Sequence, residues 1–173
     1  VEDQQHKLDV TRALLLQFQP ESCVVFCNTK QATFDVSDYL VNCGFSAVVL
    51  NGDLEQKQRD QTLVRFANKS VSILVATDVA ARGLDIDKLD AVINFDLAHD
   101  ADTHVHRVGR TGRAGAQGFA CSLYQSRDSN KLLDIEDYQK ITIEDTELPE
   151  LDSAKPVYKP NMATLRIDGG KKQ

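Results

Sequence analysis

Residues 71–85 read VSILVATDVAARGLD, an apolar run that gives way to a polar turn. The run is rich in Val, Ile and Leu, which is typical of a strand buried on both faces of a sheet. Two earlier stretches have the same order: apolar residues 23–27 precede Asn28-Thr29, and 47–50 precede Asn51-Gly52. Because ligands of such sheets collect at the carboxyl ends of the strands, we expect these polar turns to lie along one edge.

Strands and helices alternate along the chain with short connections. Further strands are predicted at 91–95 and 118–124, and helices at 8–18, 30–41, 55–67, 101–108 and 126–139. Asp53 is expected to cap the helix at 55–67, and Val41 to face inward beside Leu40. The alternation predicts an α/β fold, an open parallel sheet with helices on both faces.

Residues 106–115 read HRVGRTGRAG and hold three arginines and three glycines. The glycines would end a preceding helix, so that Arg110 and Arg113 leave its end on one side. Two planar, permanently charged guanidinium groups suit the charge that develops on a transferring phosphoryl group. For an isolated R-x-x-R pair, the alternative is a basic turn that simply faces water.

Residues 76–85 and 106–115 together resemble motifs V and VI of the superfamily 2 helicases, specifically the DEAD-box RNA helicases. Residues 24–29 resemble motif IV. Gly52, Gln56 and Arg59 match a Gly-Asp turn followed by Q-x-x-R, although Asn51 stands where the family commonly has His. The resemblance implies that residues 1–147 form a RecA-like domain, the second of two that clamp ATP and RNA between them.

The RNA-binding residues that the resemblance implies would contact the sugar-phosphate backbone: Thr29, Gly52, Gln56, Arg59, Thr77 and Arg82. Amides at helix starts, hydroxyls and arginines bind phosphate by their own chemistry. These loops carry no aromatic residue for base stacking, so the expected contact tolerates many sequences. A plain helix cap is the alternative for Thr29, and a solvated helix face is the alternative for Gln56.

The nucleotide-binding residues implied by the resemblance are Gly83, Asp85, His106, Arg110 and Arg113. Arg110 and Arg113 would be the catalytic arginines, reaching the γ-phosphate of ATP. Asp85 would accept a bond from the ribose, with a capping role as its alternative, and His106 would link the site to the other domain unless it is structural. The chain has no G-x-x-x-x-G-K-[ST] loop and no Asp-Glu-Ala-Asp segment. We therefore expect an N-terminal domain to hold most of the ATP and the Mg²⁺. We also expect this fragment alone to be inactive.

The charge of the chain is unevenly distributed. Its formal net charge is −6, but eight of its acidic residues lie between 134 and 152 with a single Lys, so basic faces elsewhere are compatible with an RNA partner. The four cysteines form no C-x-x-C pair, and we expect no metal site. Cys23, Cys27 and Cys121 lie in apolar runs, and we expect them to be buried free thiols. No apolar run is long enough to span a membrane, and a cytoplasmic location is expected.

The last residues differ in character from the rest. Residues 148–161 hold three prolines and read as a linker, and 162–173 resemble the opening strand of an RRM-like RNA-binding module. That tail, with residues 52–56 and 60–68, resembles the bacterial DbpA-type subgroup of the family. Resemblance to this subgroup implies that the parent protein is an RNA-dependent ATPase that remodels 23S ribosomal RNA during large-subunit assembly.

Two other functions stay open on the sequence. One is a superfamily 2 motor that acts on DNA, against which residues 77–85 argue. The other is a non-enzymatic RNA-binding or protein-docking domain that kept the fold.

Overall fold

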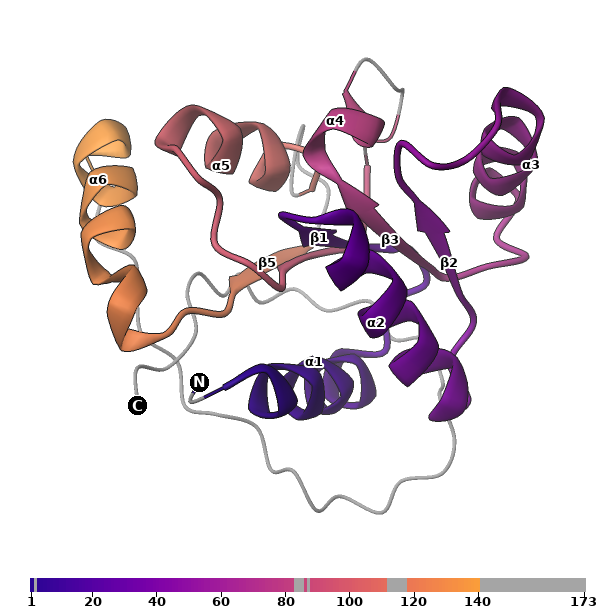
Figure 1. Cartoon of the computed structure of the whole chain (residues 1–173), viewed down its shortest axis with the longest axis horizontal. Coiled ribbons are helices and arrows are strands. Elements are labelled where there is room, and N and C mark those ends of the chain that lie inside the picture. Colours follow the sequence, from indigo (N-terminus) through magenta and orange to yellow (C-terminus); the bar gives the residue numbers. More distant parts are fainter. Residues whose placement is uncertain (2, 83–85, 87, 112–117, 141–173) are drawn as a thin grey trace.

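A computed structural model describes residues 1, 3–82, 86, 88–111 and 118–140 (Figure 1). Within them lies one five-stranded parallel sheet in the order β2-β3-β1-β4-β5. The strands are β1 (Cys23–Cys27), β2 (Ala47–Leu50), β3 (Ile73–Thr77), β4 (Ala91–Asn94) and β5 (Phe119–Ser122). The α/β fold with an open parallel sheet is therefore confirmed, with each strand within two or three residues of its predicted bounds.

Helices cover both faces of the sheet, as expected (Figure 1). They are α1 (Gln4–Phe18), α2 (Lys30–Asn42), α3 (Gln56–Ala67), α4 (Asp78–Ala81), α5 (Ala101–Val108) and α6 (Ser129–Gln139), with a 3₁₀ turn η1 (Ser126–Asp128) before the last. Helices α1 and α2 pack on one face, and α3, α4 and α5 lie on the other. Helix α6 packs against α5 beside the β5 edge through a small apolar cluster around Ile135.

Alternating side chains of the central strand, β1, pack into two separate hydrophobic cores on opposite faces of the sheet. In β1, Val25 joins the core under α1 and α2, whereas Val24 and Phe26 join the core under α3, α4 and α5. Cys23 and Cys27 are buried free thiols, as expected, and burial raises the pKa of both well above its usual value. They therefore behave as small apolar side chains.

Three details of the sequence prediction were wrong. Helix α1 begins at Gln4 instead of residue 8, because the Asp3 carboxylate caps it by accepting from the His6 amide at 2.8 Å. Helix α3 is capped by a reciprocal Glu55 and Gln58 capping box, not by Asp53. Val41 is 51% exposed, since it lies one position beyond Leu40 and so points away from the sheet.

Helix α1 ends in a conformation that a glycine would adopt more easily. Its C-cap, Gln19, has φ 45° and ψ 56°, the left-handed region. We expect Gln19→Gly to raise the free energy of unfolding by about 0.5–1 kcal/mol, because it relieves this conformation. The matched change inside the helix, Gln17→Gly, should lower it by about 1 kcal/mol. Urea unfolding of both variants checks the opposite signs, and a loss in both would contradict the prediction.

Among the residues that the structure describes, no helix combines the length and apolarity needed to cross a bilayer.

Candidate functional site

Three of the predicted site residues follow the carboxyl ends of neighbouring strands. Thr29 comes after β1, Gly52 after β2, and Thr77 ends β3. The three strands are adjacent and parallel in the order β2-β3-β1, so these residues lie along one edge of the sheet. This arrangement agrees with the single edge expected from the sequence.

The two threonines at this edge are both helix caps. The Thr29 hydroxyl accepts from the Ala32 amide at 3.1 Å and begins α2, and the Thr77 hydroxyl accepts from the Ala80 amide at 3.4 Å and begins α4. Thr29 is exposed, whereas Thr77 is buried. The capping alternative for Thr29 thus describes its contact here, and each hydroxyl marks the start of a helix.

The turn after β2 is held by side chains on either side of Gly52. The side-chain amide nitrogen of buried Asn51 donates to the Thr33 hydroxyl at 3.0 Å, and its side-chain oxygen accepts from the backbone amide of Asp53 at 2.9 Å. Asp53 also pairs with Lys30 at 2.9 Å across the exposed rim. Gly52 itself is exposed, with open space where a side chain would stand, so another molecule can approach its backbone closely.

The remaining predicted RNA residues lie on α3 and at the end of α4. Gln56 is on an exposed helix face and donates to Asp60 at 2.8 Å within α3. Arg59 donates to the Ala80 carbonyl at 2.8 Å, which joins α3 to α4. Arg82 is exposed, and of these three only Arg82 lines the cavity described next.

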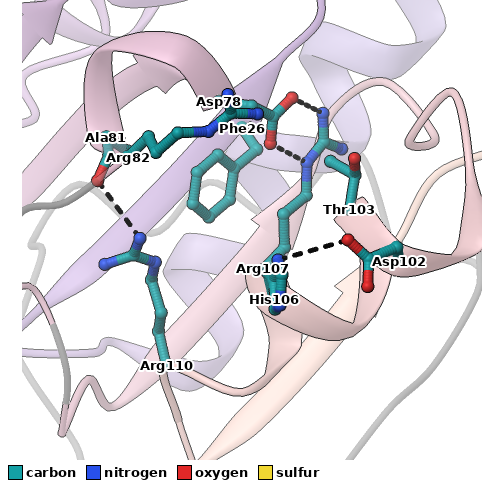
Figure 2. A pocket seen from close by; sticks show the side chains of 9 residues that line it. All are labelled: Phe26, Asp78, Ala81, Arg82, Asp102, Thr103, His106, Arg107 and Arg110. Carbon is teal, nitrogen blue, oxygen red and sulfur yellow. Dashed lines mark hydrogen bonds and ion pairs between the residues drawn. The ribbon is translucent and has the colours of Figure 1, made fainter.

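A cavity of about 350 Å³ lies between α4 and α5 (Figure 2). It is lined by Phe26, Asp78, Ala81, Arg82, Asp102, Thr103, His106, Arg107 and Arg110. One wall therefore comes from α4, which follows β3, and the other from α5 and the turn that carries the arginine-rich stretch. On the sequence, only the family resemblance placed these two segments in the same site. Arg82 and Arg110 give it cationic groups beside the backbone of α4 (Figure 2).

Arg107 forms the buried floor of this region. Only 1% of it is exposed, and it makes a two-pronged ion pair with Asp78, from Nε to Oδ1 and from Nη2 to Oδ2, both at 2.7 Å. It also donates to the Asp96 carbonyl at 2.7 Å and to the Asn28 side chain at 2.8 Å, and it lies over the Phe26 ring. Arg107 thus ties α5 to α4 and to the ends of β1 and β4.

No feature of the sequence had indicated a separate role for Arg107. The available signal was indirect: the side-chain oxygens of Asn28, Asp78 and Asn94 stand just past or at the ends of strands. Acceptors gathered at one sheet edge require a donor, and Arg107 supplies it.

Arg110 projects from the turn after α5 toward α4. Its Nη1 donates to the Ile86 carbonyl at 2.8 Å. Its Nη2 donates to the Ala81 carbonyl at 3.1 Å (Figure 2). The guanidinium therefore joins the turn after α5 to the end of α4 and to Ile86. Gly83, Asp85 and Arg113 lie outside the described residues, so their predicted roles stay predictions.

His106 is on the outer wall of the cavity. Its side chain is 74% exposed, and its Nδ1 lies 3.7 Å from the Asp102 carboxylate one helical turn earlier. This surface position leaves His106 accessible to another domain, and it does not resemble that of a structural core histidine such as buried His104.

Comparison with known proteins assigns this architecture. The family model for the helicase conserved C-terminal domain matches residues 6–115, from α1 through the arginine-rich turn. The chain belongs to this family. The chain is similar to the E. coli ATP-dependent RNA helicase DbpA. The two are 51% identical over 166 residues, which are 96% of this chain and 36% of DbpA. DeaD from Mycobacterium tuberculosis is 42% identical over 80% of this chain and 25% of its own length.

Solved structures agree with the same assignment. The E. coli DEAD-box protein SrmB, crystallised with regulator of ribonuclease activity A, is 34% identical, with a TM-score of 0.82 over 90% of this chain and 91% of that one. A DEAD-box protein from Methanococcus jannaschii is 37% identical, with a TM-score of 0.75 over 84% of this chain and 40% of that one. This helicase C-terminal domain is thus of the RecA-like, DEAD-box type and is similar to DbpA. It spans about a third of the length of the DbpA relative.

Proposed function

We propose that the chain is the second RecA-like domain of an ATP-dependent DEAD-box RNA helicase, which closes on ATP and RNA and disrupts short duplexes. The observation that carries this proposal is the cavity between α4 and α5, which both Arg82 and Arg110 line. In the parent protein, an N-terminal RecA-like domain would face this cavity and hold the nucleotide.

The RNA would lie along the edge formed by Thr29, Gly52, Thr77 and Arg82, with Gln56 and Arg59 on the adjoining helix. The exposed backbone at Gly52 and the helix starts after Thr29 and Thr77 support contact with phosphates rather than with bases. Arg59 also supports the position of α4 through its bond to Ala80. Such an edge reads the shape of the backbone and tolerates many sequences.

On the nucleotide side, we propose that Arg110 and Arg113 stabilise the charge on the γ-phosphate during transfer to water, with Gly83, Asp85 and His106 completing the site. Mg²⁺ neutralises phosphate charge when bound, and we assign it to the N-terminal domain. The described residues contain no cluster of three or more His, Cys, Asp or Glu that could hold a metal. The exposed Arg82 and the half-buried Arg110 of this cavity offer guanidinium donors that fit phosphate oxygens.

The finer role is remodelling of 23S ribosomal RNA during large-subunit assembly, in the cytoplasm. Its support is the similarity to DbpA and the resemblance of residues 162–173 to the start of an RRM-like module, joined through a linker at 148–161. Because the edge described above favours no RNA sequence, the choice of target would reside in that further module.

We expect the isolated chain to show no ATP turnover with RNA and Mg²⁺, and the parent protein to show turnover that RNA stimulates. The reason is that this domain supplies arginines to a nucleotide that the other domain binds. A steady-state phosphate-release assay with single-stranded RNA, matched DNA and no nucleic acid checks this. Stimulation by DNA alone would favour the DNA-directed motor, and RNA binding without turnover would favour the non-enzymatic alternative.

A further inference from the structure

The turn that carries Arg110 is fastened by contacts outside the cavity. Thr111 is buried, with 9% of its surface exposed, and its hydroxyl donates to the Leu89 carbonyl. Thr111 and Leu89 form a parallel bridge, and the Leu89 amide donates to the Arg110 carbonyl at 3.0 Å. The backbone from the Arg110 carbonyl through Thr111 is therefore attached to the segment that leads into β4.

Gly118 closes this contact from the side of β5. A Cβ at this position would overlap the Thr111 hydroxyl and would lie 3.1 Å from the carbonyls of Leu89 and Asp90. The next residue, Phe119, donates to Asp90 at 3.0 Å and begins the pairing with β4. The backbone at Gly118 therefore cannot move away without breaking that ladder, and a side chain there would displace Thr111 instead.

The side chain of Arg110 depends on the same neighbourhood. Its guanidinium donates to Ile86, three residues before Leu89, and to Ala81 at the end of α4. A shift of Thr111 would move the Arg110 backbone relative to the carbonyls that hold its guanidinium. Displacements on the order of 1 Å at a reacting group can lower a rate about 10²-fold.

We propose that Thr111 and Gly118 are positioning residues for Arg110: the space left by the missing side chain of Gly118 receives the Thr111 hydroxyl and fixes where the arginine enters the cavity. Neither residue touches the nucleotide. This inference rests on the proposed role of Arg110 at the γ-phosphate.

The test compares variants of the parent protein in RNA-stimulated ATP hydrolysis. Gly118→Ala is expected to lower kcat roughly tenfold or more, with the KM for ATP and the RNA affinity within about twofold of the unmodified protein. Thr111→Val, which keeps the shape but loses the hydroxyl, should lower kcat severalfold, and Thr111→Ser should recover most of that loss. The double variant Gly118→Ala/Thr111→Ala should be no slower than Thr111→Ala alone, because no hydroxyl remains to be displaced.

Thr11→Val is the matched control. Its hydroxyl is also buried and donates to a backbone carbonyl, that of Lys7, at 2.8 Å, but within α1 on the other face of the sheet. It should lose a comparable amount of stability and leave kcat unchanged. Multiplicative effects in the double variant, or an equal fall of kcat in Thr11→Val and Thr111→Val, would overturn the inference. If Gly118→Ala does not fold, the Val and Ser variants of Thr111 decide it, and an unmodified parent without RNA-stimulated turnover would refute the proposed function instead.

Discussion

Replacing Arg107 with Ala is expected to lower the free energy of unfolding of this domain by about 3–5 kcal/mol. The change removes the buried partner of Asp78 and leaves that carboxylate, the Asn28 side chain and the Asp96 carbonyl without their donor from α5. A domain of this size is stable by only about 5–15 kcal/mol, so much of its stability would be lost. Urea or guanidinium unfolding followed by circular dichroism measures the effect.

Two variants separate the fork geometry from simple loss of charge. Arg107→Lys should still cost a large part of the stability, because one ammonium group cannot replace a planar fork that serves Asp78 from two nitrogens. Arg127→Ala removes an exposed arginine from η1 and should change stability by no more than about 0.5 kcal/mol. A loss for Arg107→Ala no larger than that for Arg127→Ala would contradict the role given to this ion pair.

Replacing Arg110 with Ala in the parent protein is expected to lower kcat for RNA-stimulated ATP hydrolysis by about 10³-fold or more, with little loss of RNA affinity. The guanidinium lies in the cavity beside α4, where we propose that it meets the γ-phosphate. Because its charge would act chiefly in the transition state, kcat should fall while the KM for ATP changes little. Single-turnover and steady-state hydrolysis measure the two effects separately.

Arg82→Ala is the matched change on the same cavity wall. It should weaken RNA binding and flatten the dependence of that binding on salt, since one phosphate contact would be lost. Both arginines line the same cavity, so a shared structural effect would appear in both variants. If the two variants lost RNA affinity equally and kept kcat, the proposed division between the nucleotide side and the RNA side would be wrong.

The strands were predictable from the sequence because each is a short apolar run that ends in a polar turn. Their order in the sheet, β2-β3-β1-β4-β5, was not predicted, because the apolar runs do not indicate which strands become neighbours. The start of α1 was missed because Gln4, Gln5 and His6 are polar and face solvent, so periodicity carried no signal there and the Asp3 cap decided it. The Glu55 and Gln58 capping box has the spacing of a helix start, but Asp53, two residues earlier, is also a common capping residue and was preferred.

The candidate site was predictable in part. The turns at Thr29, Gly52 and Thr77 meet at one edge because parallel strands bring their carboxyl ends together. The roles of Arg107 and Gly118 depend on tertiary contacts with residues up to 79 positions away, and no local spacing encodes those contacts. An arginine beside a glycine-rich turn can bind a phosphate or pair with a buried carboxylate, and the burial of the arginine in the folded structure distinguishes these two roles.

The decisive measurement is a structure of the parent protein with a non-hydrolysable ATP analogue and single-stranded RNA. The account predicts that Arg110 brings a guanidinium nitrogen within about 3 Å of a terminal phosphate oxygen. It also predicts the RNA backbone along Thr29, Gly52, Thr77 and Arg82. A terminal phosphate bound on the opposite side of the sheet from the cavity between α4 and α5 would contradict it.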